Sequence, residues 1–429
     1  MTNTTNKNTT ASFEDKAVKG TDKSAAEMLG TPKPLLKSFK MNTPLKRILF
    51  AVLMLFLLVL PVYLQGFNEA LLLNSLVFVG LYVILALGLN IVVGYAGMLD
   101  FGRMAFYAVG AYAAMLFSVP VGGWAENAFG PGFATFTFPF AVVFAGAAAA
   151  FVGWLLSLPV MRLRGDYLAI VTLGFGEIVR ITLQNNPFEM TGGSVGLPPL
   201  GYTIPFPPFF EYLRDTIYWT MGNDFIFTVT RNVYWYYVVL ALLVLAVIVV
   251  RRQDNSRLGR SWAAMREDEV AATAMGVNVT KAKTLAFIMG AIWGGVAGAC
   301  LGFFMGNVSP EPFFFFNSVM VLAIVVIGGM GSIPGVIFGG LLIVGVPEVI
   351  RWFAMSHMGA AGAEVQATVS NMRNLLLGLV MVLMMALRPY GIIPMKSIKR
   401  KLYGVDNKDS DKSEKPLATA GAAPKGGAK

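Results

Sequence analysis

The chain has 429 residues, of which 56% are hydrophobic and only 14% are charged, and its formal net charge is +10. Several apolar runs reach the roughly 20 residues that a helix needs to cross a hydrocarbon core of ~30 Å. A soluble core of this size does not need such runs, so the composition excludes a soluble globular protein. It predicts an all-α, polytopic integral membrane protein.

The hydrophobic pattern predicts about ten transmembrane helices within residues 46–395. The eighth is short, so its ends are expected to be irregular. The polar segments on either side, residues 1–45 and the basic residues 396–429, are predicted to be disordered tails. The ten predicted spans cover residues 48–64, 70–92, 102–119, 138–160, 167–184, 233–250, 284–304, 317–327, 335–353 and 374–387.

The distribution of positive charge orients these spans. If the N-terminus is cytoplasmic, all but five of the 34 Lys and Arg lie on cytoplasmic tails, loops or span ends. The short loops agree, because Arg162 and Arg164 follow the fourth span and Arg251 and Arg252 follow the sixth. We therefore predict that both termini are cytoplasmic. The exceptions are Arg180, Arg214, Arg231, Arg351 and Arg373.

This topology leaves two large segments outside the membrane. Residues 185–232 form an external loop rich in Pro and aromatic residues, which is either a platform for a partner or an ordered connector. Residues 251–283 form a charged cytoplasmic segment. Within it, Ser261 is the expected N-cap of a helix that covers residues 262–275 and ends at Gly276.

The predicted helix at 262–275 is unsuited to lipid, because residues 266–269 are all charged and occupy a full turn. Trp262, Met265 and several alanines give it an apolar side that fits a groove in a soluble partner. The alternative is an ordinary solvated loop helix.

Cofactor chemistry is not expected. Cys300 and His357 are the only residues of their types, so neither a disulfide within the chain nor a His/Cys metal site is expected. The sequence contains no G-x-x-x-x-G-K-[ST] phosphate loop, so any ATP hydrolysis is expected on separate subunits. We therefore expect no cofactor and no enzymatic activity in this chain.

Charges within the spans are candidate functional groups. Glu177 is predicted near the bilayer midplane, and Arg180 follows it at i, i+3 on the same helical face. An isolated central charge costs about 2.5 to 3.5 kcal/mol, so the pair is expected to face protein or water. It either lines a polar path through the membrane or locks helices together. Asp100 and Arg103 have the same spacing and are expected to pair near the cytoplasmic side.

Glycines offer a second way to contact a substrate, because broken helices expose backbone groups that can bind a zwitterion. The alternative is that these small residues let helices pack closely. The candidate residues of such a path through the membrane are Gly94, Gly97, Gly174, Gly176, Glu177 and Arg180.

Several segments carry a family resemblance. Glu269, Val270, Ala271 and Ala272, followed by Gly276, resemble the EAA loop of ABC importer permeases, although Val270 stands where the motif has glutamate. The runs LRGDYLAIVTLGFGEIVRI (163–181), LGRSWAAMREDE (258–269), IVVIGGMGS (324–332) and RPYGIIP (388–394) are similar to the permeases of high-affinity branched-chain amino-acid ABC importers, in particular the longer of their two types. The resemblance covers roughly residues 45–400.

The resemblance implies a heteromer in the bacterial cytoplasmic (inner) membrane. It contains this chain, a second permease, two ABC ATPase subunits and a periplasmic binding protein that delivers leucine, isoleucine or valine. Relatives in the wider family carry urea or short amides. An ion-coupled secondary amino-acid transporter is the alternative class, and Asp100, Glu177 or Glu348 would then supply its coupling site.

The resemblance also implies that the charged segment 251–283 docks on the ATPase. The expected coupling residues are Leu258, Gly259, Arg260, Trp262, Met265, Arg266, Glu267, Asp268, Glu269, Ala271, Ala272 and Gly276.

Overall fold

The computed structural model describes residues 57–61, 70–129, 137–160, 163, 165–186, 189–197, 231–357 and 391–393, together with residues 378, 379 and 382. Within these residues the structure is helical, and its β structure is limited to an isolated bridge between Leu197 and Val308. The predicted all-α fold is confirmed. Both predicted tails, most of the external loop, and most of the first and tenth predicted spans lie outside the described residues.

Six segments of the described residues are long and apolar enough to cross a membrane, and they correspond to predicted spans two, four, five, six, seven and nine. They are α3 (Ala70–Asn90) with the π-helix η1 (Ile91–Tyr95), α5 (Thr137–Val160), α6 (Asp166–Gln184), α8 (Arg231–Asp254), α11 (Val279–Met305), and α13 (Ile333–Gly340) with the π-helix η6 (Leu341–Gly345) and α14 (Val346–His357).

The third and eighth predicted spans are also helical. The third lies in α4 (Arg103–Phe129), and the eighth is α12 (Phe315–Gly328), which is as short as the sequence indicates. The remaining elements are the short helices α9 (Arg257–Glu267) and α10 (Glu269–Ala274) and the 3₁₀ turns η4 (Gly193–Val195) and η5 (Glu311–Phe313).

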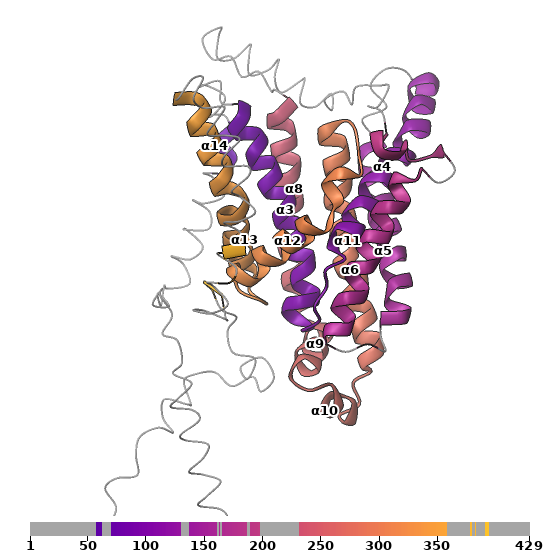
Figure 1. Cartoon of the computed structure of the whole chain (residues 1–429), viewed down its shortest axis with the longest axis vertical. Helices are drawn as coiled ribbons and strands as arrows, with labels where there is room; N and C mark the ends of the chain where they lie inside the picture. The colour runs from indigo at the N-terminus through magenta and orange to yellow at the C-terminus, as the bar shows by residue number, and fades with distance from the viewer. Residues whose placement is uncertain are drawn as a thin grey trace, which may run out of the picture. The chain divides into compact units, whose positions relative to one another are not determined.

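Two spanning helices are longer than the apolar pattern predicts. α8 continues past Val250 to Asp254, and α11 begins at Val279, where the side chain of Asn278 accepts a hydrogen bond from the Lys281 amide at 3.0 Å. The charged segment 251–283 is therefore not a simple loop, because its first and last turns continue the two spanning helices. Only α9, α10 and their short connections project beyond them (Figure 1).

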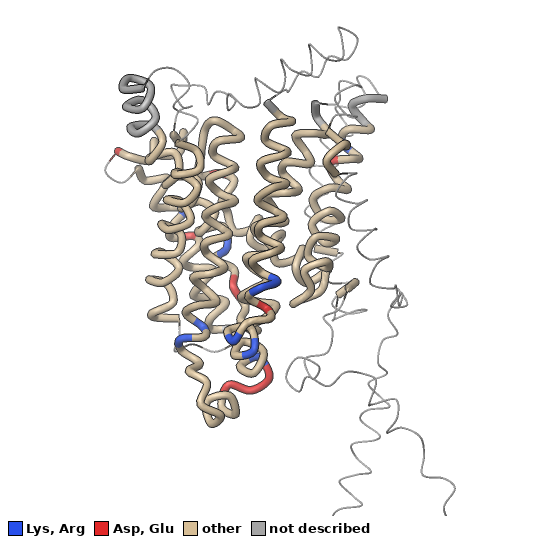
Figure 2. Tube along the Cα trace, turned by 180° about the vertical axis from the view of Figure 1, so that it is seen from behind, with Lys and Arg blue, Asp and Glu red and all other residues tan. Residues whose placement is uncertain are grey.

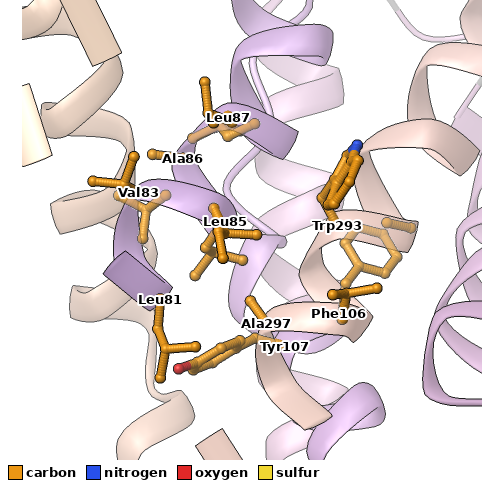
Figure 3. Close-up of a cluster of buried hydrophobic side chains, with 14 of the residues drawn as sticks. Leu81, Val83, Leu85, Ala86, Leu87, Phe106, Tyr107, Trp293 and Ala297 are labelled. Atoms are coloured by element: carbon orange, nitrogen blue, oxygen red, sulfur yellow. The ribbon is translucent and has the colours of Figure 1, made fainter. Parts of the chain in front are cut away.

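α11 lies at the centre of the helical bundle, in contact with α3, α4 and α5. Large apolar side chains fill the space between α3, α4 and α11, and Figure 3 shows Leu81 and Leu85 facing Phe106, Tyr107 and Trp293 across it. Burial of such side chains contributes about 1.5 to 3 kcal/mol each in a soluble core. In a membrane, close packing between the helices has to supply more of the association energy.

Glycines bring α11 into backbone contact with its neighbours. A Cβ on Gly295 would lie 2.6 Å from the Ala145 carbonyl oxygen of α5, and a Cβ on Gly110 of α4 would collide with the backbone of Gly295. Both neighbours are backbone atoms that no rotamer change can move. Helices therefore cross here at a distance that only glycine allows.

Gly295→Ala is expected to lower the stability of the protein by about 1 to 3 kcal/mol, because the added methyl group overpacks the crossing. Gly146 is a matched control on the facing helix, since its Cβ would meet Val296 Cγ2 at an ordinary 3.5 Å. Gly146→Ala is expected to be neutral or to stabilise the helix by up to about 1 kcal/mol. Melting temperatures of the detergent-solubilised variants measure the difference, and equal values for both would contradict the close crossing.

Candidate coupling and translocation sites

α9 begins one turn earlier than the sequence predicts. Its N-cap is Ser256, whose hydroxyl accepts a hydrogen bond from the Gly259 amide at 3.3 Å. The predicted N-cap, Ser261, lies inside the helix and donates its hydroxyl to the Arg257 carbonyl at 3.1 Å. The prediction was therefore wrong by about one turn, because both serines have the chemistry of a cap and the earlier one is used.

The predicted single helix over residues 262–275 is also wrong, because the chain breaks at Asp268. The extended Asp268 ends α9 and caps α10: its carboxylate accepts hydrogen bonds from the amides of Val270 at 2.7 Å and Ala271 at 3.0 Å. These bonds lower the pKa of Asp268. The cap therefore stabilises α10 at neutral pH and is lost as the pH falls through that lowered pKa. The predicted end at Gly276 is confirmed, with φ at 84°.

The apolar side of α9 faces the protein's own bundle. Trp262 is fully buried, and its indole Nε1 donates to the Ala282 carbonyl of α11 at 2.8 Å. Met265 is buried beside it, and α9 packs against η1, α8 and α11. The prediction that Trp262 and Met265 fill a groove in a partner is therefore wrong. These two side chains hold α9 in place.

The exposed apolar residues of this region lie on and after α10. Val270 is 66% exposed and Met275 is 85% exposed, so both are free to contact another protein. Figure 2 shows that most of the described charged residues gather at this end of the bundle. We call the surface formed by Val270, Ala271 and Met275 the α10 tip.

One ion pair fixes α10 to the bundle. Lys283 Nζ of α11 lies 2.6 Å from Glu269 Oε1, and the lysine side chain is almost fully buried. The structure thus divides the twelve predicted coupling residues. Exposed are Arg260, Glu267, Asp268, Ala271 and Gly276, whereas Leu258, Gly259, Trp262, Met265, Arg266, Glu269 and Ala272 are buried or half-buried.

Arg266 joins two groups of residues for which the sequence predicts separate roles. Its Nη1 donates a hydrogen bond to the Gly94 carbonyl, and a Cβ on Gly97 would lie 2.8 Å from Arg266 Cγ. Gly97 has φ at 72°, which suits glycine. Burial lowers the pKa of Arg266, and the neighbouring Glu267 carboxylate opposes that shift. Gly94 and Gly97 therefore contact α9 rather than an open path.

Asp100 and Arg103 form the expected pair, with Arg103 Nη2 at 3.0 Å from Asp100 Oδ2. Both side chains are fully buried, so the pair lies within the bundle rather than at a solvated interface. The other Asp100 oxygen accepts the Gly102 amide at 2.9 Å, at the start of α4. The guanidinium also lies over the Phe106 ring, 5.5 Å from its centroid. This pair fixes the link between α3 and α4.

α6 is the least covered of the six spanning segments. Only 17% of its spanning part is buried within this chain, compared with 78% for α11. The predicted pair is present on it, with Arg180 Nε at 2.9 Å from Glu177 Oε1, and both side chains are partly exposed. A Cβ on Gly174 would meet no atom within 4 Å. We call Gly174, Glu177 and Arg180, with the exposed Ile178 and Ile181, the open face of α6.

Gly176 belongs to the opposite side of α6. A Cβ there would lie 3.5 Å from Gly102 Cα, and the neighbouring Thr172 hydroxyl accepts the Phe101 amide at 3.1 Å. Of the six predicted path residues, three therefore lie on the open face of α6, while Gly94, Gly97 and Gly176 pack inside the chain.

Comparison with known proteins decides the family. The family model described as "Branched-chain amino acid transport system / permease component" matches residues 71–385, which include the α10 tip and the open face of α6. The chain belongs to this permease family. The resemblance predicted from the sequence is confirmed, and so is a multi-pass membrane protein.

Individual relatives agree. The permease is 43% identical over 331 residues to the high-affinity branched-chain amino acid transport system permease protein LivM of Salmonella typhimurium, an alignment that covers 75% of this chain and 70% of the relative. It is 29% identical over 280 residues to LivH of Escherichia coli, covering 63% of this chain and 81% of the relative. The probable LivM of Methanocaldococcus jannaschii is 26% identical over 365 residues, covering 78% and 97%. No solved structure matches the permease.

Sequence reasoning missed three residues of this permease. Val270 and Met275 form most of the α10 tip, and the available signal was an apolar residue in a charged segment. The sequence had marked Val270 only as a departure from the EAA motif and Met275 only as the end of the predicted helix. The third is Asn90, at the end of α3, whose side chain binds the Gly331 amide at 2.8 Å. A lone polar residue in an apolar run was the available signal.

Proposed function

We propose that this permease is one transmembrane subunit of an ATP-driven importer of leucine, isoleucine and valine. Family membership supports the transport class, and the names of the relatives support the branched-chain substrate. The observation that carries the mechanism is the projection formed by α9 and α10, which is anchored at its base by Trp262 and ends in the exposed α10 tip.

Two ABC ATPase subunits are the proposed energy source, since the sequence has no phosphate loop of its own. One ATPase docks on the α10 tip, where apolar side chains can enter a groove of the partner and Glu267 and Asp268 form a polar rim. The permease itself hydrolyses no ATP in this scheme.

The proposed topology follows from this docking. α9 and α10 face the cytoplasm, as do both termini, and residues 46–395 form a multi-pass domain in the bacterial inner membrane. The opposite end of the bundle carries η4, which belongs to the proposed external loop 185–232. That end receives the periplasmic amino-acid-binding protein.

A second permease is proposed to cover the open face of α6. A charged pair near the bilayer midplane is costly against lipid, so the face needs protein or water beside it. A glycine at position 174 also makes the helix about 1 kcal/mol less stable than alanine would. Among the described residues no close contact requires it, since a Cβ there would meet no atom within 4 Å. The similarity of the chain to both LivM and LivH of Escherichia coli supports a pair of related permeases. Substrate passes between them.

An ion-coupled transporter is not favoured. The three acids that the sequence offered as coupling sites each pair with an arginine three residues further along the chain: Asp100 with Arg103, Glu177 with Arg180, and Glu348 with Arg351 at 3.0 Å. A coupling acid has to bind and release its ion during the cycle, and in each of these pairs a guanidinium already occupies the carboxylate.

Reconstitution tests the proposal. The complete complex in proteoliposomes is expected to take up leucine only when ATP and the substrate-loaded binding protein are both present. Isoleucine and valine are expected to compete with leucine, and urea is not. Uphill leucine uptake by the purified permease alone under a proton or sodium gradient would reject the ABC mechanism. Uptake of urea without competition from leucine would reject the substrate class.

A further inference from the structure

Two pairs of consecutive helices are joined by irregular links, which we call the two breaks. α3 passes into η1, and the backbone then turns at Gly97 before α4 begins. α12 ends at Gly328 and is followed by Gly329 and Gly331, whose φ angles are 122° and 84°, before Ser332 caps α13. Each break leaves backbone groups without partners in its own helix, so other residues have to satisfy them.

The two breaks contact each other through Asn90. Its side-chain Oδ1 accepts a buried hydrogen bond from the Gly331 amide at 2.8 Å, across 241 positions of the sequence. Gly94 packs so tightly against the Asn90 side chain and the Gly331 amide that a Cβ on it would overlap both. A displacement of η1 therefore acts directly on the link between α12 and α13.

α9 also contacts the break between η1 and α4. Arg266 extends from α9 and donates to the Gly94 carbonyl, in the last turn of η1, while its alkyl stem lies against Gly97. Two other polar contacts of the projection, from Trp262 to Ala282 and from Glu269 to Lys283, both end on α11. Of these three polar contacts, the one made by Arg266 therefore connects the projection to a break. The other two connect it to the continuous helix α11.

We propose that Arg266 and Asn90 form a relay that transmits movement of the docked ATPase to both breaks at once. The inference rests on the proposed function, and it assigns Arg266 and Asn90 as positioning residues for ATP-driven transport. When the ATPase moves α9, Arg266 pulls on the carbonyl of Gly94, and Asn90 passes the shift of η1 to Gly331. A polar contact suits this role because it holds one geometry, whereas apolar packing allows sliding.

The test is the number of leucine molecules imported per ATP hydrolysed by the reconstituted complex. Arg266→Met keeps the length and apolar stem of the side chain but removes the donor, and it is expected to lower this ratio about tenfold, a size typical of coupling between sites. ATPase subunits are expected to remain bound and the melting temperature to stay unchanged. Arg266→Lys restores a donor and is expected to recover part of the ratio. Arg257→Gln is the matched control, because Arg257 is an exposed arginine on the same helix.

A double-mutant cycle tests the shared path. Asn90→Ala is expected to lower the import ratio like Arg266→Met, and the double variant is expected to be no worse than either single one. Multiplying losses in the double variant would overturn the relay. So would a wild-type ratio in Arg266→Met, or release of its ATPase subunits, which would assign Arg266 to docking. These comparisons apply only if the wild-type complex imports leucine with ATP, and failure of that control would reject the proposed function instead.

Discussion

Replacing Met275 with lysine is expected to prevent the ATPase from binding to the permease and to abolish ATP-driven uptake. Met275 is the most exposed apolar residue of the α10 tip, and a side chain of its size contributes about 1.5 to 3 kcal/mol when it is buried. A lysine at the interface loses this contribution and leaves a charge without a partner. We expect the dissociation constant for the ATPase to rise about 100-fold, as at an interface hot spot.

Lysine is chosen for Met275 because this residue forms the C-cap of α10, where a positive charge favours the helix. The matched control is Val195→Lys, since Val195 is 88% exposed but lies in η4 at the opposite end of the bundle. Titration of purified ATPase onto the solubilised permease pair gives the affinity. Unchanged binding by the Met275 variant would remove the α10 tip from the docking surface.

Neutralising one member of the pair on α6 is expected to destabilise the permease far more than neutralising both. Glu177→Gln leaves the charge of Arg180 without a partner, and Arg180→Gln leaves the charge of Glu177 without one. An unpaired charge near the bilayer centre lowers stability by about 2.5 to 3.5 kcal/mol. The double variant carries no such charge, so its melting temperature is expected to return close to the wild-type value. Melting of the three solubilised complexes measures this pattern.

Leucine uptake by the same three variants separates the two roles that the sequence left open. If the pair lines the path between the permeases, uptake stays low in the double variant although its stability is restored, and this is the result we expect. Full uptake by the double variant would make the pair purely structural. The pair of Glu348 and Arg351 on α14 has the same spacing and supplies the control, for which Glu348→Gln with Arg351→Gln is expected to retain uptake.

Local rules predicted much of the fold and part of the site. Long apolar runs located the described spanning helices, and the i, i+3 spacing alone predicted the pair of Glu177 and Arg180. Competing local signals caused the errors in α9. Ser256 and Ser261 are both suitable caps, and Asp268 can continue a helix or start a new one. Contacts with distant residues complete this region, such as the bond from Trp262 to Ala282.

The direction in which an apolar surface faces could not be predicted at all. The pattern around Trp262 and Met265 indicates an apolar side, but the same pattern serves a helix packed on its own bundle and one that binds a partner. Only the position of α11 and η1 beside α9 decides between them. Likewise, no spacing rule connects Asn90 to Gly331, because their contact depends on how two distant breaks pack together.

The glycine crossing of α11 with α4 and α5 limits how the permease can change shape. Helices that touch through backbone atoms have no flexible side chains between them to absorb a slide or a rotation. α4, α5 and α11 should therefore move as one rigid body during transport. Opening and closing of the path must then come from α6, which is mostly exposed in this chain, and from the two breaks, where helices are joined by turns and single hydrogen bonds. The change between outward-facing and inward-facing states is then a hinged motion of the other helices around the rigid body formed by α4, α5 and α11.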